Sequence, residues 1–106
     1  MLRIYGVILD VVKKLGPVVG QIEKRDGDLG RQMRRALCSV ALNTAEGMGS
    51  SAGNRRMRYH TALGSMQETK ACLEVGAALG YVGAVDAGML DQVERIIGTL
   101  VKLVGK

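Results

Sequence analysis

Apolar residues recur every three or four positions along most of this chain, which is the spacing of one face of an α-helix. Over residues 2–24 two neighbouring apolar stripes follow this spacing. Gly16-Pro17 interrupts the segment, but both stripes stay in phase across it, so we expect a continuous helix that is kinked there. The stripes are Ile4, Ile8, Val11, Leu15, Val18 and Ile22, and beside them Tyr5, Leu9, Val12 and Val19.

The same spacing predicts three further helices. The second runs from Asp28, its expected N-cap, to about Met48, and the third spans residues 53–79 after a turn in which Ser50 or Ser51 is the N-cap. Because short connections join long helices, neighbouring helices should be antiparallel. The sequence therefore predicts an all-α, up-down-up-down four-helix bundle that forms one domain over residues 1–106.

Two signals separate the third helix from the fourth. Gly80 followed by Tyr81 is typical of a helix C-terminus, at which a glycine in the left-handed conformation precedes an apolar residue. Asp86 is the expected N-cap of the last helix. The apolar residues of that helix repeat at heptad spacing, as Leu90, Val93, Ile97, Leu100 and Val104.

The second and third helices are apolar on two opposite sides. A helix that is apolar all round has to be buried all round, yet only one side of a helix in a bundle of this size can face the core. We therefore predict that the other side meets another subunit, through Cys38, Ala41, Leu42 and Ala45 of the second helix. The predicted second face of the third helix is Met57, Gly64, Ala71, Val75 and Leu79.

The entire net charge of +5 lies in residues 24–60, which favours an anionic partner such as RNA or DNA. Arg55, Arg56 and Arg58 surround a flexible turn and a helix start, where backbone donors and the helix dipole also favour phosphate. The alternative is a solvated cluster without a ligand. Arg31, Arg34 and Arg35 form a second basic group.

For Arg34 and Arg35 two interpretations stay open. Guanidinium groups suit phosphate oxygens, but either residue could instead pair with Glu46, with Glu68 or with a carboxylate of another subunit. A polar stripe of the second helix, Gln32, Ser39, Asn43 and Glu46, should bond to Ser65 and Glu68 of the third, because buried polar groups require partners. We interpret this group as a structural network that fixes helix register, rather than as a catalytic pair of carboxylates.

A longer motif crosses the second helix: Gln32-Met33-Arg34-Arg35-Ala36, then Ser39-Val40, Asn43 and Ala45-Glu46-Gly47. It resembles the central signature of the bacterial four-helix bundle proteins first noticed as products of intervening sequences in 23S ribosomal RNA genes. The likeness continues through Tyr59, Ala62, Gly64-Ser65-Met66, Glu68, Leu73 and Gly80-Tyr81. Three positions depart from the pattern: Thr44 replaces Ile, Ser50 stands where Arg is common, and Tyr59 replaces Phe.

The resemblance implies a ring-like homo-oligomer, typically a pentamer. It also implies kinship with the accessory protein of diversity-generating retroelements, which binds nucleic acid and a reverse transcriptase through basic surfaces. From the residues themselves we expect no catalytic site, no cofactor and no metal: the single His60 lacks a Glu-x-x-His pair, and the two cysteines lie in apolar helical surroundings as free, buried thiols.

No apolar run approaches the length that crosses a bilayer, so we expect a soluble protein without a membrane partner. Two free thiols suit a reducing compartment, so the expected location is the cytoplasm. Two functions remain as alternatives. The first is a non-enzymatic oligomer that binds nucleic acid without reading its sequence. The second is a protein–protein adaptor without a nucleic-acid partner, in which the arginines serve assembly.

Overall fold

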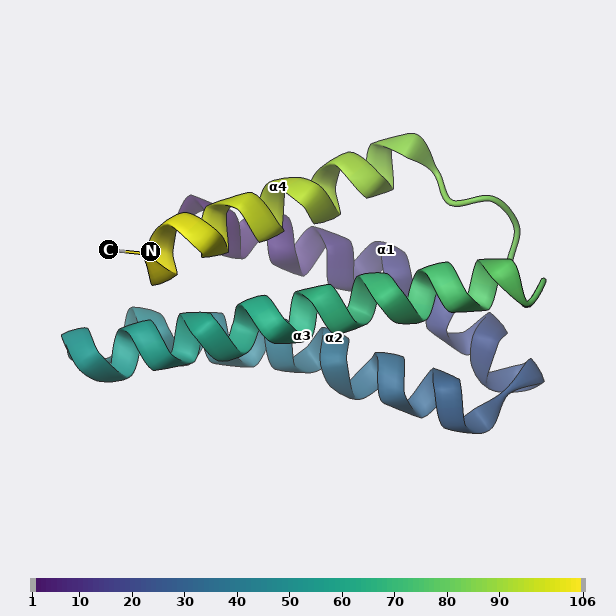
Figure 1. The fold of residues 1–106 in the computed structure, drawn as a ribbon, viewed down its shortest axis with the longest axis horizontal. Coiled ribbons are helices and arrows are strands. Elements are labelled where there is room, and N and C mark those ends of the chain that lie inside the picture. Colours follow the sequence, from purple (N-terminus) through teal and green to yellow (C-terminus); the bar gives the residue numbers. More distant parts are fainter. Residues whose placement is uncertain (1, 106) are drawn as a thin grey trace.

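The four predicted helices are all present. The computed structural model describes residues 2–105, and these residues contain α1 (Arg3–Arg25), α2 (Gly27–Met48), α3 (Ala52–Ala78) and α4 (Ala87–Val104), with no β-strand. Each helix contacts the next one in the chain, and α4 also contacts α1. Figure 1 shows that the three connections alternate between the two ends of an elongated bundle, and that α1 begins at the end where α4 finishes. The all-α fold is thus confirmed, and α1 continues through Pro17.

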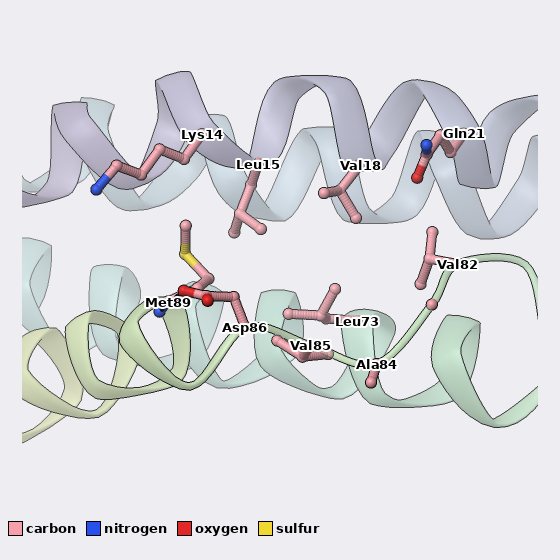
Figure 2. A pocket seen from close by; sticks show the side chains of 11 residues that line it. Lys14, Leu15, Val18, Gln21, Leu73, Val82, Ala84, Val85, Asp86 and Met89 are labelled. Atoms are coloured by element: carbon pink, nitrogen blue, oxygen red, sulfur yellow. Dashed lines mark hydrogen bonds between the residues drawn. The ribbon is translucent and has the colours of Figure 1, made fainter.

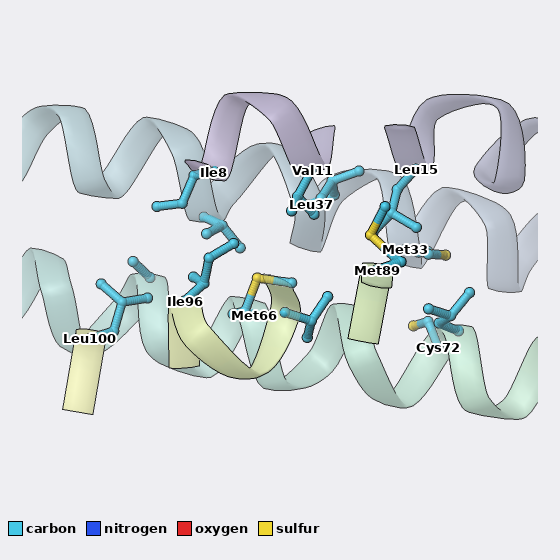
Figure 3. Close-up of a cluster of buried hydrophobic side chains, with 14 of the residues drawn as sticks. Ile8, Val11, Leu15, Met33, Leu37, Met66, Cys72, Met89, Ile96 and Leu100 are labelled. Carbon is cyan, nitrogen blue, oxygen red and sulfur yellow. The ribbon is translucent and has the colours of Figure 1, made fainter. Parts of the chain in front are cut away.

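One hydrophobic core runs along the bundle and takes side chains from all four helices. Figure 3 shows these side chains pointing toward one another from different helices. In α1 the buried stripe is the predicted one, except that Val19 replaces Val18, which is half-buried. The buried residues of α2 are Gly30, Met33, Ala36, Leu37, Val40, Thr44 and Gly47, and those of α3 are Tyr59, Ala62, Met66, Thr69, Cys72, Leu73 and Gly76.

The predicted core stripe of α4 was partly wrong. Val93 and Leu100 are buried as expected, but the stripe is completed by Met89 and Ile96, whereas Leu90 and Ile97 are only half-buried. Two overlapping apolar stripes share Val93 and Leu100 in this helix, and periodicity alone cannot choose between them. Packing against α1 and α3 selects the stripe one residue earlier.

A single residue, Asp26, connects α1 to α2. Its N–H donates to the carbonyl oxygen of Ile22 at 2.7 Å, and its Oδ1 accepts from the N–H of Leu29 at 3.0 Å. The predicted N-cap, Asp28, was wrong because α2 begins at Gly27, before that residue. The Asp28 carboxylate instead pairs with Arg31 at 2.6 Å.

The other helix ends follow the predicted capping chemistry more closely. Ser51 occupies the N-cap of α3 without a side-chain capping bond, and the Ser50 hydroxyl donates to the Glu46 carbonyl at 2.6 Å. Gly80 has φ +77°, which confirms the left-handed cap, and the N–H of Tyr81 donates to the Gly76 carbonyl at 2.9 Å. Asp86 caps α4 by accepting from the N–H of Met89 at 3.0 Å.

Three glycines allow helices to approach closely. A Cβ at Gly30 would lie 2.7 Å from Cα and 2.8 Å from the backbone N of Glu23, so α1 and α2 touch backbone to backbone there. At Gly47 a Cβ would meet the ring of Tyr59, and at Gly76 it would lie 2.8 Å from Cδ1 of Ile22. The first two contacts bring α2 close to α1 and to α3, and the third brings α3 close to α1.

Candidate nucleic-acid interface and assembly surfaces

Arg55, Arg56 and Arg58 lie in the first two turns of α3, beside the turn that follows α2. Arg55 donates to the carbonyl oxygen of Ser50 at 2.9 Å, which is a neutral acceptor, so this contact does not neutralise its charge. Arg58 forms an ion pair with Glu46 at 2.9 Å. Arg56 is exposed. The three arginines therefore stay together at one end of the bundle, and Arg58 already has a carboxylate partner.

The second basic group, Arg31, Arg34 and Arg35, lies toward the other end of α2. From Arg34 to the C-terminal end of α2 there are about fourteen residues, or roughly 21 Å of helix. The six arginines therefore form two separate groups rather than one continuous patch. Arg35 is exposed, and no carboxylate in residues 2–105 lies within 4.0 Å of it.

Arg34 has a partner that the sequence analysis did not include. Its guanidinium donates through two nitrogens to the carboxylate of Glu23 in α1, at 2.5 and 3.3 Å. This hydrogen bond lowers the pKa of Glu23 and raises that of Arg34. The expected partners, Glu46 and Glu68, were wrong for this residue. The expectation of a short connection after the first helix could have revealed the pair, because a short connection brings the last turn of α1 beside the first turns of α2.

A polar network links α2 to α3. The Ser65 hydroxyl donates to Oγ of Ser39 at 2.8 Å, and Asn43 Nδ2 donates to the same oxygen at 2.9 Å. Arg58 then bridges the side chains of Asn43 and Glu46. Ser39, Asn43, Glu46 and Ser65 are thus brought into one chain of contacts.

Three residues distinguish this network from the predicted one. Gln32 was predicted to belong to it, but this residue is exposed and lies outside it. Arg58 is part of it, although the sequence analysis placed that residue only in the phosphate group; it lies seven residues, or two turns, before Ser65 on the same side of α3. Glu68 is exposed and lies outside the network. Because Glu46 pairs with Arg58, ten residues or about 15 Å of helix before Glu68, the two carboxylates are not brought together.

The outer sides of α2 and α3 carry exposed apolar residues. The exposed fractions are 62% for Leu42, 55% for Met57, 46% for Val75 and 56% for Leu79. Ala41 and Ala45 are half-buried. A single copy of the chain therefore leaves uncovered the faces that the sequence analysis predicted to meet another subunit.

The two cysteines are both free but differ in their surroundings. Cys72 is buried, and this burial, together with the negative charge of Glu68, raises the pKa of its thiol. The prediction that Cys38 is buried was wrong for the single chain, because this residue lies on the outer side of α2 near Leu42.

A family model described as 23S rRNA-intervening sequence protein matches residues 2–102, which include α1, α2, α3 and most of α4. The chain belongs to this family. No curated protein and no solved structure matches it.

In this member of the 23S rRNA-intervening sequence protein family, the described residues reveal neither a spanning helix nor a metal cluster. None of the helices in residues 2–105 combines the length and the apolar character needed to cross a bilayer. Across the same residues, no three His, Cys, Asp or Glu side chains are grouped so that they could hold a metal ion.

Proposed function

We propose that this protein is a non-enzymatic, ring-like homo-pentamer whose basic surface binds RNA or DNA without sequence specificity. The observation that carries the proposal is the exposed apolar surface on the outer sides of α2 and α3. The proposal includes an antiparallel up-down-up-down order of the helices, a bend at Gly16-Pro17 and a cytoplasmic location, which suits two free thiols.

The exposed apolar surface supports assembly on energetic grounds. Fully burying a Val, Leu or Met side chain is favourable by about 1.5–3 kcal/mol. Leu42, Met57, Val75 and Leu79 each keep roughly half of their surface in water. Covering these four would therefore contribute several kcal/mol, on the order of 3–6 kcal/mol, to the association of each subunit. The subunit number of five rests on the family resemblance.

Placing a charge on the outer side of α2 tests the assembly. Leu42→Glu or Ala45→Glu should give monomers of 11.3 kDa or insoluble protein, because a carboxylate would have to be desolvated in the interface. Val101→Glu is the matched control, since Val101 is 51% exposed but belongs to α4. The measurement is the native mass by light scattering. An unchanged native mass for Leu42→Glu would contradict the proposed interface.

An arginine that is paired with a carboxylate is less available to phosphate than one that is not. Arg31, Arg34 and Arg58 each have a carboxylate partner. Arg35 and Arg55 have none within 4.0 Å in the described part of the chain, so phosphate need not compete with a carboxylate for them. Because exposed ion pairs are worth only about 0–1 kcal/mol, phosphate could also displace the carboxylate from Arg58.

Salt dependence tests the nucleic-acid contact. Binding to duplex should weaken as salt rises, with a slope of log affinity against log salt near −0.9 for each neutralised phosphate. Replacing Arg55, Arg56 and Arg58 together with Ala should reduce the slope by up to about 2.7. A matched control removes the same charge elsewhere, through Lys13→Ala, Arg95→Ala and Lys102→Ala, all at exposed positions.

Two results would decide against this function. If the wild-type protein binds neither RNA nor DNA at low salt and tens of micromolar protein, the nucleic-acid role is wrong. If the slope of log affinity against log salt falls equally in the arginine variant and in the control variant, the contact is not at the start of α3. The first result would favour the second candidate, a protein–protein adaptor. The ion pairs of Arg31, Arg34 and Arg58 support that candidate, because they give these arginines a structural role.

A further inference from the structure

The connection between α3 and α4 leaves part of α1 without α4 beside it. This linker spans residues 79–86, so α4 begins only at Ala87, beyond the point where α3 ends. On the side that α4 leaves open, the second half of α1 faces the linker, whose residues 82–85 are small or β-branched. Figure 1 shows α4 reached through this long loop at one end of the bundle.

A cavity of about 270 Å³ lies between α1 and this linker. Figure 2 shows Leu15 and Val18 of α1 pointing toward the linker from one side, with Leu73 and Val82 pointing back from the other. The wall is completed by Met89 of α4, and it is predominantly apolar. Two charged groups at its edge are already engaged: Lys14 pairs with Asp10 at 2.9 Å, and Asp86 caps α4.

The cavity continues into an open depression of about 410 Å³, with which it shares Gln21, Val82 and Gly83. This depression is lined by two cations, Lys24 and Arg25. The guanidinium carbon of Arg25 lies 5.7 Å from the centre of the Tyr81 ring, so the cation rests on the aromatic face. Within residues 2–105 neither cation has a carboxylate closer than 4.0 Å. An apolar chamber therefore opens toward a positively charged mouth.

We propose that this composite site binds a small amphipathic carboxylate, with its apolar body in the cavity and its carboxylate at Lys24 and Arg25. Apolar cavities of about 150 Å³ already accept benzene, so the cavity here has room for one aromatic ring with a short alkyl chain. The carboxylate of Asp26 lies beside Arg25 in sequence, but it accepts from the N–H of Leu29 and from the Tyr81 hydroxyl, at 3.0 and 3.4 Å. The charge of the mouth thus favours an anion.

This site is independent of the proposed function. It shares no residue with the two arginine groups or with the exposed apolar faces of α2 and α3. It can therefore bind its ligand whether or not the protein forms a ring or contacts nucleic acid.

Three probes separate the apolar part of the recognition from the charged part. Calorimetric titration of the full-length protein with 4-phenylbutanoate should show saturable binding, 4-phenylbutanol should bind more weakly, and acetate should not bind, because it lacks the apolar body. The double variant Lys24→Gln/Arg25→Gln should lower the affinity for 4-phenylbutanoate by about two- to tenfold. Its affinity for 4-phenylbutanol should stay within twofold of the wild-type value. The charge-matched control is Lys13→Gln/Lys102→Gln, which should leave the affinities for both phenyl compounds within twofold of the wild-type values.

Filling the cavity tests the apolar part. Val82→Trp places a larger side chain in the chamber from the linker and should abolish binding of both phenyl compounds. Val18→Phe fills the chamber from α1 and replaces Val82→Trp in the test if that variant fails to fold. Val12→Phe, at a half-buried position of α1 outside the cavity, is the control and should bind normally. The proposal is overturned if 4-phenylbutanoate fails to bind at millimolar concentration, if the filled variants bind it unchanged, or if both double variants weaken it equally.

Discussion

Replacing Gly30 with Ala tests how closely α1 and α2 are packed. The added Cβ would collide with Cγ of Glu23, and it would also lie 2.7 Å from Cα and 2.8 Å from the backbone N of that residue. Side-chain rotation can relieve only the first contact. The other two involve the backbone of α1, so the two helices would have to move apart.

The expected cost follows from two opposing effects. Forcing an extra carbon into a packed contact destabilises a protein by about 1–3 kcal/mol, whereas replacing Gly by Ala inside a helix is favourable by about 1 kcal/mol. For Gly30→Ala the net loss in the free energy of unfolding should be up to about 2 kcal/mol. Gly76→Ala should cost less, because its nearest neighbour is the flexible end of the Ile22 side chain, at 2.8 Å.

Gly20→Ala is the matched control, since a Cβ at this position of α1 meets nothing within 4 Å. It should stabilise the protein by up to about 1 kcal/mol through helix propensity alone. Urea unfolding followed by circular dichroism gives the free energies; all variants are compared at one protein concentration, because the stability of an oligomer depends on it. The reasoning is refuted if Gly30→Ala is as stable as Gly20→Ala.

Three further predictions concern thiols, acid and a turn. At pH 8 a thiol reagent should modify Cys72 only as fast as the protein unfolds. Cys38 should react faster in the monomeric Leu42→Glu variant than in the wild-type oligomer, and equal rates at Cys38 would argue against the interface. Hydrogen bonds from Lys14 and Gln92 lower the pKa of Asp10 below its ordinary value of 3.8, so its ionised form stabilises the folded state and this contribution is lost as the pH falls through the folded pKa. Asp10→Asn should therefore flatten the loss of stability below about pH 4, measured by urea unfolding, relative to Asp91→Asn at an exposed position. Gly80→Ala should destabilise by about 1–2 kcal/mol in thermal unfolding because φ is +77°, and an effect no larger than that of Gly83→Ala would contradict this.

The helices and most of the core could be predicted because both depend on local periodicity. The stripe of α1 contains enough apolar residues to identify its buried side, and Asp86 and Gly80 mark helix ends through capping chemistry that acts within a few residues. The predicted N-cap of α2 was wrong by two positions, and the predicted core stripe of α4 was partly wrong by one. Periodicity identifies a face, but the contact with the next helix decides which residue lies at its centre.

The contacts between helices could be predicted only in part. The serines and Asn43 of the α2–α3 network were recognised because polar residues on a half-buried stripe need partners. Arg58 was assigned to phosphate alone, since its charge indicates attraction to anions but does not say which carboxylate lies within reach. The chamber under the linker could not be predicted, because it depends on how far α4 diverges from α1.

The one-residue junction at Asp26 has a consequence for the order of folding. This residue ends one helix, caps the next and accepts from the hydroxyl of Tyr81, which lies 55 residues later in the chain. With almost no loop to close, the hairpin of α1 and α2 forms from contacts that are local in sequence, and such contacts are made early and quickly. Its amide protons should be the last to exchange with solvent, while the long linker before α4 opens first.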